Sequence, residues 1–463
     1  MSPLLPEIDG AAFESLLGGA DYGEAFLESS RGLSVRFEDG RVEEITQGVE
    51  GGTGLRFLRR EGGEVVTLQG SAHTVDAAGA ARLRAELFAG SQAPARTPLA
   101  PVTRFVRPVR VDPSSVPLER KVALLKEVDA ALRAEFPRIR QASLAYAERR
   151  RDVVILNSEG AHRREERTSV LFHVSVVAEK DGELQTGHEV IGGLKGWEML
   201  EDNDPFSAAR AAARRALAKL EAPKAKAGEM PIVLSSSAGG TFIHEAIGHS
   251  LEADHVQEGS SPHYKGMVGK VVAPENITVV DDPTLPFYRG SFGFDDEGLE
   301  AKPTPLVKDG VLVDYLYDRV TAMKERKPSN GHGRRESFHC RPIPRMSNLY
   351  IAPGKDDPKA ILKKLKAGML VTRMGGGQVN TATGEFVFEV DEGFWVEDGV
   401  IRHMIRDANL LGVGPEILKS IDGVGWDMGW GIGTCGKDGQ GVPVGDGQPT
   451  ISIPKILIGG RHE

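Results

Sequence analysis

"GLSVRFEDGRVEEITQGVE", residues 32–50, is the stretch that decides the fold of the N-terminal half. Apolar and polar side chains alternate towards a central Asp-Gly pair, and such alternation is typical of a strand with one buried face. An Asp-Gly pair between two strand-like runs is typical of a tight hairpin turn. Similar runs lie on both sides, in "EAFLESS" (24–30) and "GTGLRFLRREGGEVVTLQ" (52–69). The sequence therefore predicts an antiparallel sheet whose strands are joined by Gly-containing turns.

Helical segments surround these strands and complete an α/β domain over residues 1–225. Ala-, Arg- and Leu-rich runs have helical spacing, whereas the Pro-rich stretch 91–117 is expected to be irregular. We expect helices at residues 10–18, 74–90, 118–135 and 205–221, and further strands at 140–158 and 166–180.

The character of the sequence changes after "EAPKAKAGEM" (221–230), which we interpret as a linker. Short strand-like segments separated by Gly follow, such as "GVLVDYLYD" (310–318), "GEFVFEVDEGFWVEDGVIRH" (384–403) and "PTISIPKILIGG" (449–460). Helices are expected there at residues 241–253, 318–326 and 357–367. A chain of 463 residues is too long for one compact core. The prediction is an α+β protein with a mostly β C-terminal domain over residues 230–463.

Composition narrows the classes of function. The chain carries 57 Lys and Arg against 66 Asp and Glu, a net charge of -9, which disfavours a nucleic-acid partner bound through its phosphates. The N-terminus lacks the basic and apolar regions of a signal peptide, and no apolar run reaches the roughly 18 residues of a membrane span. The two cysteines, Cys340 and Cys435, do not suggest a disulfide framework. We therefore expect a cytoplasmic protein.

The segment "TFIHEAIGHSLEADH", residues 241–255, carries a candidate metal motif. His244, Glu245 and His249 form H-E-x-x-x-H, one residue longer than the H-E-x-x-H of zinc peptidases. On a regular α-helix, residues five apart point about 140° away from each other, so the two imidazoles would not share an ion. We therefore expect a π-helical turn or a helix break between them, with Gly248 loosening the backbone. The alternative is an ordinary surface helix with solvated His and Glu side chains.

A catalytic zinc site needs about three protein ligands and one open position. His244 and His249 would be the first two, and Glu245 beside them would be the general base. From the residues alone, the third ligand stays open among Glu252, Asp254, His255, His263, Cys340 and Cys435. Glu252 and Asp254 are also candidates to orient a ligand imidazole from behind.

Several longer motifs carry a resemblance to a known family. The segments are "HEAIGHSLEAD", "VVDDPTLP" with "GSFGFDDEG", "NGHGRRESF" with "PRMSNLYIAPG", "GGGQVNTATGEFVF" and "CGKDGQGVPVGDGQPT". In this order they resemble the TldD/PmbA family of metallopeptidases and span nearly all of residues 230–463. The N-terminal half matches more loosely, through "VEEITQGVEGGTGLRF". The PmbA (TldE) branch lacks the H-E-x-x-x-H ligands, so this chain resembles the catalytic TldD type.

The resemblance implies one zinc ion per chain, held by His244, His249 and Cys435, with Glu245 catalytic. It implies hydrolysis of small or unfolded peptides, bound in an extended conformation inside a dimer cleft. The partner would be a PmbA/TldE-like homologous subunit in a heterodimer, or a second copy of this chain. Cys340 would then not be a ligand.

Four further residues are candidates for substrate binding: Arg289, Asp295, Asp296 and His332. Arg289 would bind a peptide carboxylate, although such arginines more often form structural ion pairs. Asp295 and Asp296 in "GFDDEG" would recognise a peptide amino terminus or orient the site; solvated acids in a turn are the alternative. His332, in a Gly-flanked loop, would stabilise the oxyanion.

Two other classes of function compete with a peptidase. A blue-copper electron-transfer protein also uses two His and one Cys, but it leaves Glu245 beside a ligand unexplained. A non-catalytic peptide-binding regulator would hold its zinc for structural reasons. Substitution of Glu245 distinguishes it from an enzyme.

Overall fold

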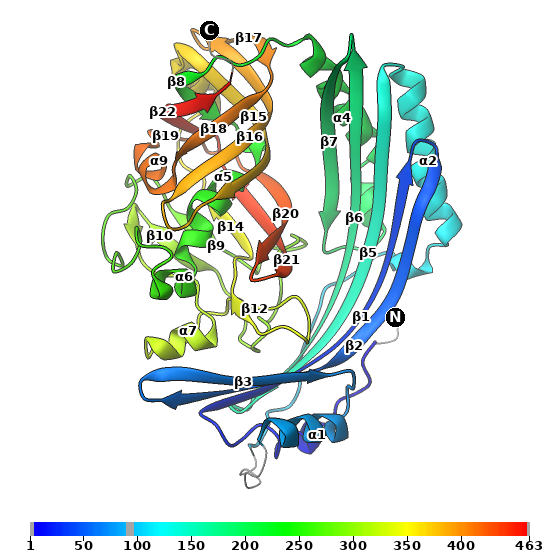
Figure 1. Cartoon of the computed structure of the whole chain (residues 1–463), viewed down its shortest axis with the longest axis vertical. Coiled ribbons are helices and arrows are strands. Elements are labelled where there is room, and N and C mark those ends of the chain that lie inside the picture. The colour runs from blue at the N-terminus through cyan, green and yellow to red at the C-terminus, as the bar shows by residue number, and fades with distance from the viewer. Residues whose placement is uncertain (1–3, 89–96, 461–463) are drawn as a thin grey trace.

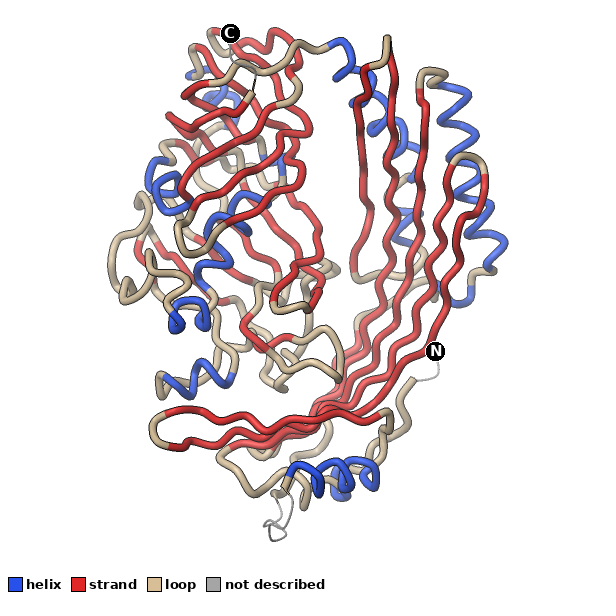
Figure 2. Tube along the Cα trace, in the orientation of Figure 1, coloured by secondary structure: helices blue, strands red, loops and turns tan. Residues whose placement is uncertain are grey.

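The computed structural model describes residues 4–88 and 97–460. An N-terminal part with one large sheet stands beside a C-terminal part made mostly of shorter strands (Figures 1 and 2). This arrangement confirms the predicted α+β class. The chain passes between the two parts after α4 (Pro205–Glu221), just before β8 (Gly228–Leu234), within the predicted linker. Among the described residues, no helix combines the length and apolar character needed to cross a membrane.

The N-terminal sheet has the strand order β3-β2-β1-β5-β6, and β4 and β7 both pair with β6. The strands are β1 (Tyr22–Glu38), β2 (Arg41–Glu61), β3 (Glu64–Ala72), β4 (Thr103–Val106), β5 (Ile139–Asn157), β6 (His162–Lys180) and β7 (Glu183–Gly193). All pairs are antiparallel except β4 with β6. Asp39 and Gly40 form the predicted hairpin turn, both with positive φ (47° and 85°), as such a turn requires.

The long strands curve, so that the upper sheet stands beside the C-terminal part and the lower end turns beneath it (Figure 1). The helices α2 (Leu118–Glu135) and α4 cover the outer face of the upper sheet, and α1 (Ala77–Leu87) lies at the lower end. The predicted helices at 118–135 and 205–221 are confirmed. The end of the one predicted at 74–90, like residues 91–96, lies outside the described residues.

The helix predicted at residues 10–18 is wrong, because only Gly10–Ala12 form a short 3-10 turn. The chain there packs Leu16 and Leu17 into the core beneath the sheet. Arg84 of α1 donates to the carbonyls of Leu16 (2.9 Å) and Gly18 (2.8 Å). These tertiary contacts fix an irregular path that local propensity does not reveal.

In the C-terminal part, the five strands β15-β8-β22-β18-β16 close into a barrel, because β16 pairs back with β15. The other barrel strands are β15 (Ala367–Val379), β16 (Glu385–Glu397), β18 (Ala408–Val413) and β22 (Ile451–Gly459), flanked by β17 (Val400–Ile405) and β19 (Gly423–Val424). The barrel includes the strands predicted within 384–403 and 449–460. The helices α8 (Pro358–Lys364) and α9 (Gly414–Ser420) contact β22 of the barrel, whereas α7 (Arg319–Lys324) contacts β3 of the N-terminal sheet.

A second sheet has the order β11-β10-β9-β14-β21-β20, so β20 is an edge strand. Its members are β9 (Val279–Asp281), β10 (Thr304–Lys308), β11 (Val311–Leu312), β14 (Asn348–Ile351), β20 (Gly429–Lys437) and β21 (Gln440–Gln448). The strand predicted at 310–318 is reduced to β11. After it, the backbone N–H of Leu316 bonds to the carbonyl of Leu251 instead of continuing a ladder.

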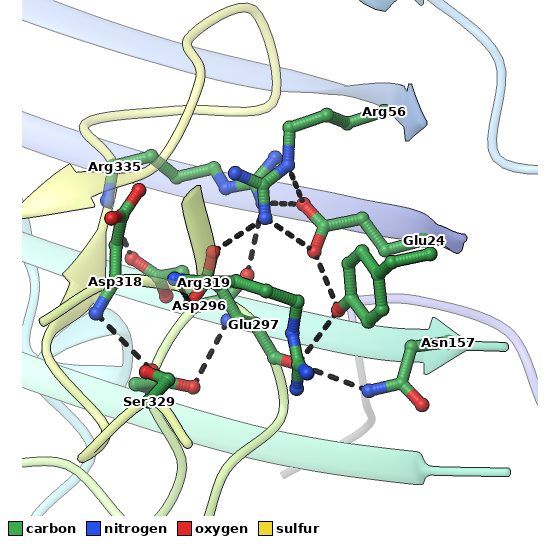
Figure 3. Close-up of polar contacts among 12 residues, drawn as sticks. Glu24, Arg56, Asn157, Asp296, Glu297, Asp318, Arg319, Ser329 and Arg335 are labelled. Atoms are coloured by element: carbon green, nitrogen blue, oxygen red, sulfur yellow. Dashed lines mark hydrogen bonds and ion pairs between the residues drawn. The ribbon is translucent and has the colours of Figure 1, made fainter. Parts of the chain in front are cut away.

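A buried polar cluster joins the two parts of the chain (Figure 3). Arg56 of β2 lies 2.9 Å from Glu24 of β1 and 2.5 Å from Glu297 of the C-terminal part. Arg335, also from the C-terminal part, forms an ion pair with Glu24. These four side chains are at most 2% exposed. Charges removed from water in this way must stay paired, so the cluster fixes how the two parts sit.

Replacing Arg56 with methionine deprives two buried carboxylates of their shared partner. We expect the free energy of unfolding, measured by chemical denaturation, to fall by about 3–5 kcal/mol. The matched control is Arg36→Met, which breaks an exposed ion pair with Glu44 and should cost less than about 1 kcal/mol. Equal effects of the two substitutions would show that the buried cluster does not hold the parts together.

Candidate metal centre

The H-E-x-x-x-H segment lies on a helix that changes its winding at the first histidine. Thr241–Ile243 form an α-helical start (α5), His244–Gly248 a π-helical turn, and His249–Leu251 a 3-10 turn. The backbone N–H of His249 bonds to the carbonyl of His244, five residues earlier. The two imidazole centres are therefore only 5.2 Å apart. Of the two predicted alternatives, a π-helical turn or a helix break, the structure has the π-helical turn.

Packing on both sides holds this helix between the barrel and the second sheet. Its buried side chains Phe242, Ile243, Ala246, Ile247 and Leu251 belong to the main core of the C-terminal part. Gly248 has ordinary helical angles (φ −56°, ψ −53°), so the expected loosening of the backbone there is wrong. A Cβ at this position would instead lie 2.1 Å from Sδ of Met346. The absence of a Cβ at Gly248 leaves room for the buried side chain of Met346.

Cys435 of β20 supplies the third donor. Its Sγ lies 3.4 Å from Nε2 of His249, and one donor atom each from His244, His249 and Cys435 lie within 4.8 Å of one another. The side chain of Cys340 instead lies 3.9 Å from the hydroxyl of Ser337 and is not in this group. His244 and Cys435 are buried, whereas the side chain of His249 is 12% exposed.

The donor set fits a zinc ion. Zinc–nitrogen and zinc–sulfur bonds of about 2.0 and 2.3 Å in a tetrahedron put nitrogen and sulfur roughly 3.5 Å apart, close to the distance between His249 and Cys435. Nδ1 of His244 is buried without a hydrogen-bond partner among the described residues. Imidazole with thiolate also suits zinc better than the hard ions magnesium or calcium.

Electrostatics favour a thiolate at this position. Burial alone raises the pKa of the Cys435 thiol, but hydrogen bonds and charge from His244 and His249 lower that pKa to about 5. A deprotonated thiol is the form that binds metal.

Glu245 lies next to the three donors and is more exposed than they are. One of its carboxylate oxygens is 4.0 Å from Nε2 of His249, and its side chain is 25% exposed, more than either histidine. Burial raises the pKa of this carboxyl above its ordinary value, despite the opposing charge of the histidines. A carboxylate with a raised pKa is a stronger base, as proton transfer near neutral pH requires.

Beside the three donors lies a second group of side chains that could hold a metal ion: Glu252, Asp254 and His255. Glu252 accepts a hydrogen bond from Nδ1 of His249 (3.0 Å). Lys437, two residues beyond Cys435 on β20, reaches both Glu252 (3.1 Å) and Asp254 (2.7 Å). The pattern C-x-K, with alternate residues of a strand on one face, is the signal by which sequence reasoning would have found Lys437.

A cleft of about 510 Å³ lies between the two parts of the chain and borders the start of this helix. Strand β7 lines it from one side, and Thr241, Trp430, Ile432 and Arg373 line it from the other. Arg373 bridges to Glu189 of β7 (3.0 Å). The cleft therefore has strand backbone and charged side chains along its walls.

The four residues predicted to bind substrate do not line this cleft among the described residues. Arg289 donates to the carbonyl of Gly433 (2.6 Å) and so supports β20 near Cys435. Asp295 accepts backbone N–H groups within its own turn, and Asp296 accepts that of Arg335, beside the cluster in Figure 3. His332 is fully buried against Thr304 (3.0 Å). A role of these residues in substrate binding stays a prediction.

Comparison with known proteins gives matches over most of the chain. Family models described as PmbA/TldA metallopeptidase domain 1, central domain and C-terminal domain match residues 23–84, 111–220 and 227–460. A "Metalloprotease TldD homolog" of Haemophilus influenzae is 33% identical, over 96% of this chain and 93% of that protein. A "Zinc metalloprotease TldD homolog" of Saccharolobus solfataricus is 28% identical, over 74% of this chain and 76% of that protein.

A solved structure from Thermotoga maritima, described as a candidate modulator of a DNA gyrase, has the same fold. Its TM-score is 0.77 at 20% identity, covering 95% of this chain and 96% of that one.

Gly248→Ala tests whether close packing sets the position of the helix. The added methyl group collides with Met346, so we expect the free energy of unfolding to fall by about 1–3 kcal/mol in chemical denaturation. Gly436→Ala is the matched control, because an added Cβ there meets nothing within 4 Å. If both variants are as stable as the wild-type protein, the packing argument for Gly248 is wrong.

Proposed function

Because this chain belongs to the PmbA/TldD family of metallopeptidases, we propose that it is a zinc-dependent peptide hydrolase. His244, His249 and Cys435 hold one zinc ion per chain. The observation that carries this proposal is the convergence of these three donors from a π-helical turn and an edge strand 186 residues away. The zinc named for the Saccharolobus relative agrees with it.

The ion supplies Lewis acidity towards the scissile carbonyl when bound. Glu245 takes the proton of the attacking water and later passes it to the leaving amine. Its raised pKa and its partial exposure next to His249 suit this exchange. His249, with Nδ1 turned towards Glu252, keeps Nε2 free to face the ion.

The substrate is a small or unfolded peptide in an extended conformation. Among the described strands, β20 pairs only with β21 and β7 only with β6, so each has a free edge. Residues of both strands line the cleft. A peptide that adds to such an edge gains main-chain hydrogen bonds with little demand on its side chains. Folded proteins do not present a free strand to an edge inside this cleft.

The chain works together with a second subunit, either a PmbA/TldE-like homologue or a second copy of this chain. The upper part of β2 supports such a contact, because β3 pairs with β2 only from Thr53 onwards. Val49 on this edge is 69% exposed. Exposed strand edges of this kind readily accept a partner.

The protein is located in the cytoplasm. Its two cysteines, Cys340 and Cys435, are both free thiols, as is usual in that reducing compartment.

Metal analysis tests the ligand set. We expect about one zinc per wild-type chain, lost in Cys435→Ala and retained in Cys340→Ala, because only Cys435 belongs to the donor group. Elemental analysis at equal protein concentration measures this directly. Loss of zinc through Cys340 alone, or a wild-type protein without zinc, would refute the site.

Glu245→Gln tests the enzyme. The amide keeps the shape of the side chain but takes up no proton, so cleavage of an unstructured peptide should fall by about 10²–10⁴-fold while zinc is retained. Glu258→Gln, at an exposed position of the next helix, is the control. A wild-type protein that binds such peptides but never cleaves them, alone or with a partner subunit, would identify a regulator instead.

A further inference from the structure

A buried chain of charged groups lies directly behind His249. Nδ1 of His249 donates to Oε2 of Glu252 at 3.0 Å, and Nζ of Lys437 lies 3.1 Å from the same oxygen. Lys437 also donates to Asp254 (2.7 Å) and to the carbonyl of Pro344 (3.1 Å). The side chain of Glu252 is 0% exposed and that of Lys437 is 5% exposed. Because these groups are buried, water does not compete for their hydrogen bonds or screen their charges.

The backbone explains how these groups meet. The helix ends at Leu251, and Glu252 is extended (φ −73°, ψ 126°), so its side chain turns back towards His249. Lys437 and Cys435 are two residues apart on β20, and side chains at this spacing lie on the same face of a strand. The edge strand β20 thus supplies both the candidate ligand Cys435 and the cation Lys437, which contacts the carboxylate partner of His249.

Glu252, Asp254 and His255 have donor atoms close enough together to hold a cation of their own. The ammonium group of Lys437 lies within hydrogen-bond distance of two of these side chains. It therefore fills the position that a second metal ion would need, and the positive charge comes from the chain itself.

We infer that Lys437 and Glu252 are positioning residues for the metal centre, an inference that rests on the proposed function for the identity of the ion. Lys437 holds the carboxylate of Glu252 in its buried position. Glu252 in turn accepts a hydrogen bond from Nδ1–H of His249, which fixes the ring with Nε2 towards Cys435 and the ion. Carboxylates behind a ligand imidazole are known to orient the ring and to raise metal affinity.

Each member of this chain of contacts has a separate part to play. Without Glu252, the imidazole is free to rotate and the ammonium of Lys437 loses a buried partner. Without Lys437, the carboxylate of Glu252 keeps its contact with His249 and, farther away, those with His255 (4.0 Å) and the charge of Arg345. Asp254 contacts Lys437, whereas the hydrogen-bond partner of His249 is Glu252. A substitution of Asp254 therefore removes a partner of the lysine without removing the group that orients the imidazole.

The test is the affinity of the metal-free, full-length protein for zinc, measured by competition with a chromophoric chelator at one pH. Glu252→Gln should weaken binding by about 10–100-fold, and Lys437→Met should weaken it in the same direction. Lys437→Arg, which keeps the charge, should restore most of the affinity. Asp254→Asn should change it much less. The double variant Glu252→Gln/Lys437→Met should be no weaker than Glu252→Gln alone, because the two residues act in series.

The absorption spectrum of the cobalt-substituted protein provides a second readout. It would not change if Glu252 and Lys437 only stabilised the fold. The visible and thiolate-to-metal absorption bands should shift in Glu252→Gln and be recovered in Lys437→Arg. Unchanged affinity and spectra in Glu252→Gln, or an equal loss in Asp254→Asn, would overturn the inference even if peptide cleavage is established. A wild-type protein that binds zinc tightly but cleaves no peptide would overturn the proposed function and leave this inference standing.

Discussion

The candidate metal centre depends on one constraint: the imidazoles of His244 and His249, five residues apart in sequence, must reach the same point. A regular helix cannot meet it, so the backbone takes up one wider turn at His244–Gly248. Such a turn persists only where its surroundings hold it. Here the barrel and the second sheet press on the helix so closely that Gly248 has no room for a methyl group. Gly414 passes Ala246 with equally little room, since a Cβ there would lie 2.2 Å from the carbonyl oxygen.

The remaining architecture serves to bring β20 beside that turn. Arg345, fully buried, donates to the carbonyl of Cys435 (2.5 Å) and to that of Gln440 (3.2 Å), so it ties down both strands of the hairpin β20–β21. Arg289 supports the same strand from the other side. Three arginine contacts to main-chain oxygen thus fix the position of one thiol, because a backbone carbonyl moves less than a side chain.

Long regular elements could be predicted from the sequence, because their signals are local. The helix at 118–135 repeats its apolar face, and the Asp39–Gly40 turn has the residues that positive φ demands. The spacing of His244 and His249 is also enough to predict a π-helical turn or a helix break, and the structure has the π-helical turn. The barrel closure, the short 3-10 turn at Gly10–Ala12 and the surroundings of His332 depend on contacts between distant residues. Cys435 was one of six candidates until the family resemblance singled it out, and nothing local marks Glu252 as the partner of Lys437.

The cluster around Glu24 also has a consequence for how the chain is made. Glu24 and Arg335 are 311 residues apart in sequence. At a synthesis rate of about 5–20 residues per second, Arg335 leaves the ribosome roughly 15–60 s after Glu24. Until then, the partners of Glu24 can come only from the first half of the chain, where Arg56 and the hydroxyl of Tyr22 contact it. The full set of partners that keeps Glu24 paired and out of water is therefore available only after most of the chain has been made.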